Sequence, residues 1–115
     1  ICKYINIIFS NYVIKFTSKV IKELNAQGVT LIGLTDDLQV MKVDNLYTVF
    51  YHGLKAMSHD ITMDRALEII DEYFEEDENN DLETFFKLIL EEYANAMGLG
   101  KKFRETMIQQ GIATE

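Results

Sequence analysis

Three consecutive segments of the chain carry apolar residues at three- and four-residue steps, the spacing of one face of an α-helix. They cover residues 45–58, 63–76 and 82–97. Polar runs separate them, and the sequence contains no proline that would interrupt a helix. A chain with three such segments in a row is expected to fold mainly as helices that share one apolar core.

Each of these predicted helices has a candidate N-cap, a residue whose side chain accepts a bond from a free amide of the first turn. Asp44 and Thr62 are the candidates for the first two helices. Asn80, with Glu83 three residues later, matches the spacing of a capping box before the third. The side chains expected on the apolar faces are Leu46, Val49, Phe50, Gly53, Leu54 and Met57, then Ala66, Leu67, Ile69, Ile70, Tyr73 and Phe74, then Leu82, Phe85, Phe86, Ile89, Leu90, Tyr93 and Met97.

The N-terminal part of the chain has a different pattern. Residues 4–16 are rich in β-branched and aromatic residues, broken once by Ser10 and Asn11. This pattern predicts a short β-hairpin. A helix through residues 8–24 is the alternative, because short apolar runs fit either structure and the turn lacks the glycine that the best two-residue turns use.

The next stretch is expected to hold a short helix and then a loop. The helix covers about residues 18–27, capped by Thr17 or Ser18 and ended by Gly28. Residues 29–37 contain a glycine and two threonines and are expected to form a mobile loop, with at most a helical turn at 37–41.

The C-terminal part predicts one more amphipathic helix, at residues 99–110, beyond a hinge formed by Gly98 and Gly100. At 115 residues the whole chain fits one domain. The expected fold is therefore a mainly α domain of four to five helices with a short N-terminal β-hairpin. Its parts are the hairpin at 4–16, a helical core at 18–97 and the terminal helix at 99–110.

The charge of the chain is unevenly distributed. Residues 60–92 hold thirteen acidic residues against Arg65 and Lys87, a local charge of −11, which leaves +3 for the rest of a chain whose net charge is −8. Such a run is typical of a solvated helix face, and its sharper interpretation is a docking surface for a basic partner. The negative charge argues against nucleic-acid binding, which needs clustered Lys and Arg.

No metal site is expected. Asp77, Asn79 and Asp81 have the spacing of the first ligands of a calcium loop, but Leu82 and Leu88 stand where that loop needs glycine and a bidentate glutamate. A di-iron bundle would need Glu-x-x-His elements, which the sequence lacks.

An enzyme is not expected either, nor a cofactor. His52 and His59 are the two histidines, and Cys2 is the one cysteine, remote from both in sequence. Without a recognisable nucleophile and base pair or a glycine-rich phosphate loop, the residues point to no catalytic chemistry.

Nothing in the sequence suggests a membrane or export role. No window approaches the roughly 18 apolar residues of a spanning helix, and the apolar N-terminus lacks a signal-peptide pattern. We expect a soluble, cytoplasmic protein without a membrane partner.

The order of these segments resembles the tail assembly chaperones of long-tailed phages and prophages. The segments that carry the resemblance span nearly all of residues 4–100 and read YINIIFSNYVIKF, SKVIKELNAQG, DNLYTVFYHGLKAM, TMDRALEIIDEYFEE and DLETFFKLILEEYANAMG. The resemblance implies a helical, non-enzymatic protein of the bacterial cytoplasm that binds the tape measure protein during tail assembly. In many members of that family a longer frameshift product recruits tail tube subunits, so the resemblance also makes the tail tube protein an expected second partner.

The terminal helix is the expected partner-binding element. Leu99, Phe103 and Met107 recur at four-residue steps, with Ile108 beside them, and this stripe either contacts a partner or mediates self-association. The alternative functions are an acidic mimic of nucleic acid or another small helical adaptor that docks on a basic partner.

Overall fold

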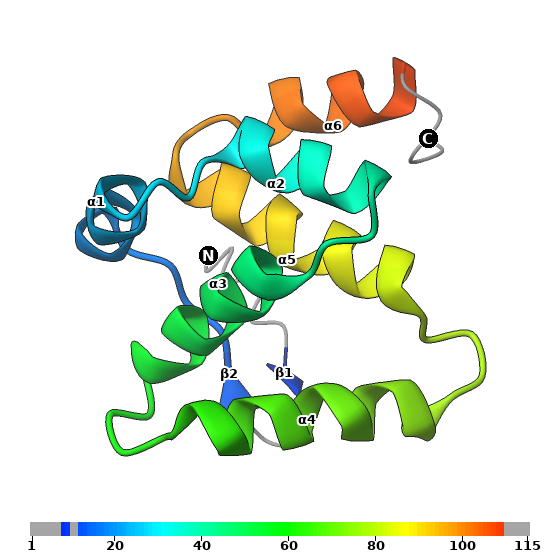
Figure 1. Ribbon diagram of the computed structural model, residues 1–115. Coiled ribbons are helices and arrows are strands. Elements are labelled where there is room, and N and C mark those ends of the chain that lie inside the picture. Colours follow the sequence, from blue (N-terminus) through cyan, green and yellow to red (C-terminus); the bar gives the residue numbers. More distant parts are fainter. Residues whose placement is uncertain (1–7, 10–11, 110–115) are drawn as a thin grey trace, which may run out of the picture.

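The computed structural model describes residues 8–9 and 12–109. These residues form a two-stranded hairpin and six α-helices, so the mainly α fold with an N-terminal hairpin is confirmed, although the expected number of four to five helices is too low (Figure 1). The elements are β1 (Ile8–Phe9), β2 (Tyr12–Val13), α1 (Ser18–Ala26), α2 (Leu31–Gln39), α3 (Asp44–Lys55), α4 (Met63–Glu76), α5 (Leu82–Ala96) and α6 (Gly100–Gln109).

The hairpin pairs β1 and β2 in antiparallel register, with Ile8 opposite Val13 and Phe9 opposite Tyr12. The alternative of a helix through residues 8–24 is therefore wrong. Residues 4–7 and the predicted turn at 10–11 lie outside the described residues. After β2 the chain runs extended into the core, where Ile14 and Phe16 are buried.

Helix α1 begins and ends as predicted. The Thr17 side chain accepts a hydrogen bond from the amide of Val20 at 3.2 Å, which makes Thr17 the N-cap. At the other end Gly28 has a positive φ, and the amide of Val29 bonds back to the carbonyl of Leu24 at 3.0 Å. Both Leu24 and Val29 are buried, so this turn also anchors α1 in the core.

The prediction of a mobile loop at residues 29–37 is wrong, because α2 occupies residues 31–39. Thr30 caps this helix by accepting a bond from the amide of Gly33 at 2.9 Å, which offsets the low helix propensity of glycine there. Leu34 is buried, and Leu31 and Leu38 pack beside it on the core. These three leucines share one face of α2, which packs against α5.

Two of the predicted caps are corrected. Asp44 lies inside the first turn of α3, and Val43 precedes it without a side-chain cap. At α5 the capping box is formed by Asp81 and Thr84 instead of by Asn80 and Glu83. The side chain of each accepts a hydrogen bond from the backbone amide of the other at 2.9 Å. Asn80 donates to the carbonyl of Tyr73 at 2.9 Å, so its side chain ties the end of α4 to the start of α5.

The cap at α4 agrees with the prediction, since Thr62 accepts a bond from the amide of Arg65 at 3.1 Å. The helix ends differ only slightly: α3 stops at Lys55, and α5 stops at Ala96. Shorter helices explain why Met57 and Met97 are exposed although the sequence predicted them on apolar faces.

The core is centred on aromatic rings carried by three helices. The ring of Phe85 on α5 is fully buried, with Phe50 of α3 at a centroid distance of 5.1 Å and Tyr73 of α4 at 5.9 Å. Tyr93 contacts Phe16 edge-on at 5.5 Å, which joins the extended chain to the other end of α5. Helix α5 thus runs through the core, and α4 and α6 lie on opposite sides of the molecule (Figure 1).

Candidate interaction surface

The junction between α5 and α6 is a fixed turn and not the hinge that the two glycines suggested. Gly98, with φ of 75°, donates to the carbonyl of Asn95 at 3.0 Å, and Leu99 donates to the carbonyl of Ala94 at 2.8 Å. This pair of bonds is a Schellman motif, which favours glycine at the residue with positive φ. The side chain of Asn95 also lies directly against Gly100, leaving no room for a Cβ there.

Two apolar side chains stand out at this turn, Met97 and Leu99, which are 38% and 39% exposed. Helix α6 follows and packs against α5. Of the predicted partner-binding residues, the structure therefore places Leu99 at the surface. The other three, Phe103, Met107 and Ile108, fall within α6, but their side chains lie outside the described part of the structure.

The acidic run of the sequence becomes an exposed face of α4. All six carboxylate residues of this helix are exposed, namely Asp64, Glu68, Asp71, Glu72, Glu75 and Glu76. No Lys or Arg occurs between Arg65 and Lys87. The face therefore carries concentrated negative charge, and α4 itself lies across the molecule from α6 (Figure 1).

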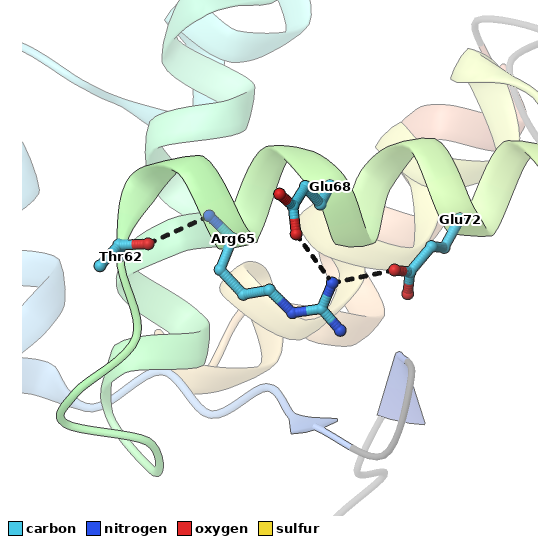
Figure 2. Close-up of polar contacts among 4 residues, drawn as sticks. All are labelled: Thr62, Arg65, Glu68 and Glu72. Carbon is cyan, nitrogen blue, oxygen red and sulfur yellow. Dashed lines mark hydrogen bonds and ion pairs between the residues drawn. The ribbon is translucent and has the colours of Figure 1, made fainter.

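Arg65 neutralises part of this face (Figure 2). Its Nη1 donates to Glu68 Oε1 at 3.1 Å and to Glu72 Oε2 at 2.9 Å, and its guanidinium lies 5.8 Å from the centre of the Tyr12 ring. The bonds to Glu72, Tyr12 and Glu68 raise the pKa of Arg65 above its ordinary value. Because the group is exposed, these contacts orient side chains and link the hairpin to α4 more than they stabilise the fold.

A shallow cavity of about 320 Å³ lies beside this cluster. The lining residues are Tyr12, Ser58, His59, Asp60, Ile61, Thr62 and Arg65. Among the described residues, no side-chain hydrogen bond joins His59 to Ser58 or Asp60. His52 lies elsewhere, on α3 against Tyr51 with ring centroids 5.3 Å apart, and burial lowers its pKa.

Two of the three residues with calcium-loop spacing, Asp77 and Asp81, use their carboxylates for local hydrogen bonds to the backbone. The carboxylate of Asp77 accepts a bond from the amide of Asn79 at 2.8 Å, and Asp81 caps α5. Within the part of the chain that the structure describes, no three His, Cys, Asp or Glu side chains are grouped so that they could hold a metal ion.

Glu92 on α5 is the one carboxylate with a strongly shifted proton affinity among the described residues. Burial, and secondly the neighbouring charge of Glu91, raise the pKa of Glu92 to about 7. Its Oε1 is buried and has no hydrogen-bond partner in the described structure. A carboxyl in this position holds its proton to near-neutral pH.

The sequence did not single out the apolar edge of α4 as a surface. Leu67 was predicted to face the core with Ile70 and Phe74, but it is 38% exposed, whereas Ile70 is buried. The signal that would have found it is the width of the apolar arc, because the seven apolar residues of α4 cover more of the helix surface than its neighbours can bury.

The described helices include none that is both long and apolar enough to cross a bilayer. Comparison of the chain with protein families, with curated proteins and with solved structures finds no match. The chemistry and geometry of these surfaces therefore have to support any functional assignment.

Proposed function

We propose that this protein is a non-enzymatic assembly chaperone that binds the tape measure protein of a long-tailed phage or prophage. The observation that carries the proposal is the exposed apolar pair Met97 and Leu99, held by a fixed turn at the entrance to an amphipathic terminal helix. The order of the helices and the sequence resemblance to tail assembly chaperones support it.

The proposed mechanism is coverage of apolar helices. A tape measure protein waiting for its tube exposes long apolar stripes, which would aggregate if left bare. A helix that presents its own apolar stripe packs against such a surface. Weak contacts repeated along a rod gain from multivalency, so each single contact need not be strong.

The proposed setting is the cytoplasm of a bacterial host. The primary partner is the tape measure protein, and tail tube subunits are the proposed second partner through a longer frameshift product. No metal, cofactor or catalytic residue takes part in this function.

The test is co-expression with the tape measure protein encoded by the same genome. We expect the chain to keep that protein in the soluble fraction and to co-elute with it during size-exclusion chromatography. The same co-expression with an unrelated long helical protein is the control. If the tape measure protein is equally soluble alone and never co-elutes with the chain, the proposal fails.

A second candidate function is supported by the six exposed carboxylates of α4, which would suit an acidic mimic of nucleic acid. Against it, Glu68 and Glu72 are partly neutralised by Arg65. Salt separates the two candidates: a mimic loses affinity for its basic target steeply as salt rises, whereas apolar packing persists.

A further inference from the structure

Helix α4 turns an apolar edge toward solvent. Met63, Leu67 and Phe74 lie on this edge, with the buried Ile70 between the last two. Leu67 is exposed, while Met63 and Phe74 are half-buried. Because residues at these three- and four-residue steps share one side of a helix, they lie along one edge of α4, and Leu67 is the exposed residue of this edge.

Helix α3 packs against α4 and brings Tyr47 near Asp71 of this helix. The half-buried ring of Tyr47 lies 6.0 Å from the ring of Phe85, and Phe74 of α4 approaches the same ring at 6.2 Å. Burial, and secondly the carboxylate of Asp71, raise the pKa of Tyr47, which agrees with Asp71 lying near the phenol. We name the surface formed by Tyr47, Met63, Leu67, Asp71 and Phe74 the α3–α4 face.

Unneutralised carboxylates border the α3–α4 face. Asp64 precedes Leu67 by three residues and Asp71 follows it by four, so both flank its side chain on the helix. In the described structure neither Asp64 nor Asp71 makes an ion pair. Arg65, the one basic residue of α4, is directed to Glu68 and Glu72 instead (Figure 2).

We propose that the α3–α4 face is a docking site for an amphipathic helix of a partner protein that carries Lys or Arg beside its apolar stripe. The apolar edge of α4 receives the stripe, and Asp64 and Asp71 pair with the basic flank. The negative charge of Asp64 and Asp71 favours a basic helix over other occupants of this face. The α4 of a second copy would set carboxylates against carboxylates, and a nucleic acid would bring phosphates to them.

This inference rests on the proposed function in one respect, since the tape measure protein would supply the basic helix. It adds a second contact surface that includes α4, a helix on the side of the molecule opposite α6 (Figure 1). Two separated surfaces would let one chaperone hold two stretches of the same long partner.

The test uses a synthetic amphipathic peptide of about 18 residues, roughly 27 Å long as a helix, with a leucine stripe flanked by lysines. A matched peptide carries glutamates in place of the lysines. Binding to the full chain is followed by fluorescence anisotropy, and the contacted helices are identified from amide chemical shifts. We expect the lysine peptide to bind and to shift amides of α3 and α4, and the glutamate peptide not to bind.

Two variants of exposed residues and one control locate the site. Leu67→Ser and Asp71→Lys should each weaken binding of the lysine peptide about tenfold. Asp36→Lys places the same charge change on the exposed surface of α2 and should change the affinity less than about twofold. Circular dichroism of each variant establishes that the helices are intact.

Several results would overturn the proposal: equal binding of the two peptides, no binding of the lysine peptide, or equal losses in Asp71→Lys and Asp36→Lys. Self-association of the chain without peptide, abolished by Asp71→Lys, would instead assign the face to a second copy. Binding of the lysine peptide without any binding of the tape measure protein would refute the proposed function and leave the docking site standing. Binding of the tape measure protein without any binding of the lysine peptide would refute the docking site alone.

Discussion

The backbone amide of Lys15 donates a hydrogen bond to the carbonyl of Gly53 at 3.0 Å. Gly53 lies in the last turn of α3, where helix carbonyls lack partners within the helix. The extended chain that follows the hairpin therefore completes the end of α3. It can approach so closely because residue 53 has no side chain.

The first prediction is that Gly53→Ala destabilises the fold. A Cβ at this position would lie 2.8 Å from Ile14 Cγ2 and 2.8 Å from Phe16 Cζ, and both neighbours are buried. Overpacking of this kind costs about 1–3 kcal/mol. Urea unfolding should show a lower midpoint, whereas Lys55→Ala, an exposed change in the same helix, should leave it nearly unchanged. Equal midpoints for wild type and Gly53→Ala would show that the contact relaxes freely.

The second prediction separates the observed capping box from the one expected from sequence. Asp81→Ala removes the acceptor of the Thr84 amide and should lower the free energy of unfolding by about 1 kcal/mol. Glu83→Gln keeps the size of the side chain that the sequence predicted in the capping box. It should lower the free energy of unfolding by at most a few tenths of a kcal/mol. Urea titrations of both variants test this, and a larger loss in Glu83→Gln would contradict the observed cap.

Local signals were sufficient to predict most helices. Thr17 and Thr62 each stand before an apolar repeat, and their helices begin where the sequence predicts. The missed helix α2 had local signals of its own, since Thr30 is its N-cap and Leu31, Leu34 and Leu38 recur at helical spacing. Gly33 favoured a loop in the prediction, and burial of Leu34 against the rest of the chain overrode the low helix propensity of this glycine.

The candidate surfaces were predictable only in part. Spacing placed Leu99 on an amphipathic terminal segment, and it is indeed exposed. Spacing alone assigned Leu67 to the core with Ile70, because it cannot show which part of a wide apolar arc the neighbouring helices cover. The position of Asp71 near Tyr47 arises between two helices and has no counterpart in the sequence pattern.

The third prediction concerns pH. The pKa of Glu92 is raised to about 7, above its ordinary value of 4.5, so the folded state binds this proton more tightly than the unfolded state. The stabilisation that the fold gains from binding this proton is therefore fully present at pH values below 4.5, the ordinary pKa, and is lost as the pH rises through about 7. Glu92→Gln, which stays neutral, should raise the free energy of unfolding at pH 8 by about 1 kcal/mol after allowance for solvent screening.

At pH 5 the same substitution should have a much smaller effect, because wild-type Glu92 is then protonated in the folded state. Urea titrations at the two pH values measure the difference. Glu75→Gln, at an exposed position of α4, is the control for removing one negative charge. A gain in stability from Glu92→Gln that is equal at pH 5 and pH 8 would show that the carboxyl does not titrate in this range.

The last prediction tests the terminal helix as a partner contact. Phe103→Ser combined with Met107→Ser removes two large apolar residues from the stripe that begins at Leu99 and recurs at four-residue steps. Burial of such a stripe against another chain contributes about 25 cal/mol per Å² before association costs, so its loss should be measurable. Binding to a tape measure segment, or any self-association, should weaken, while the urea midpoint of the chain stays nearly unchanged. Lys101→Ser with Gln109→Ser, two exposed positions of the same helix, makes the same number of changes and should preserve both binding and stability. If the apolar double variant instead unfolds at markedly lower urea and binds normally per folded molecule, the stripe belongs to the core of the domain, and the contact with the partner must be sought on the α3–α4 face.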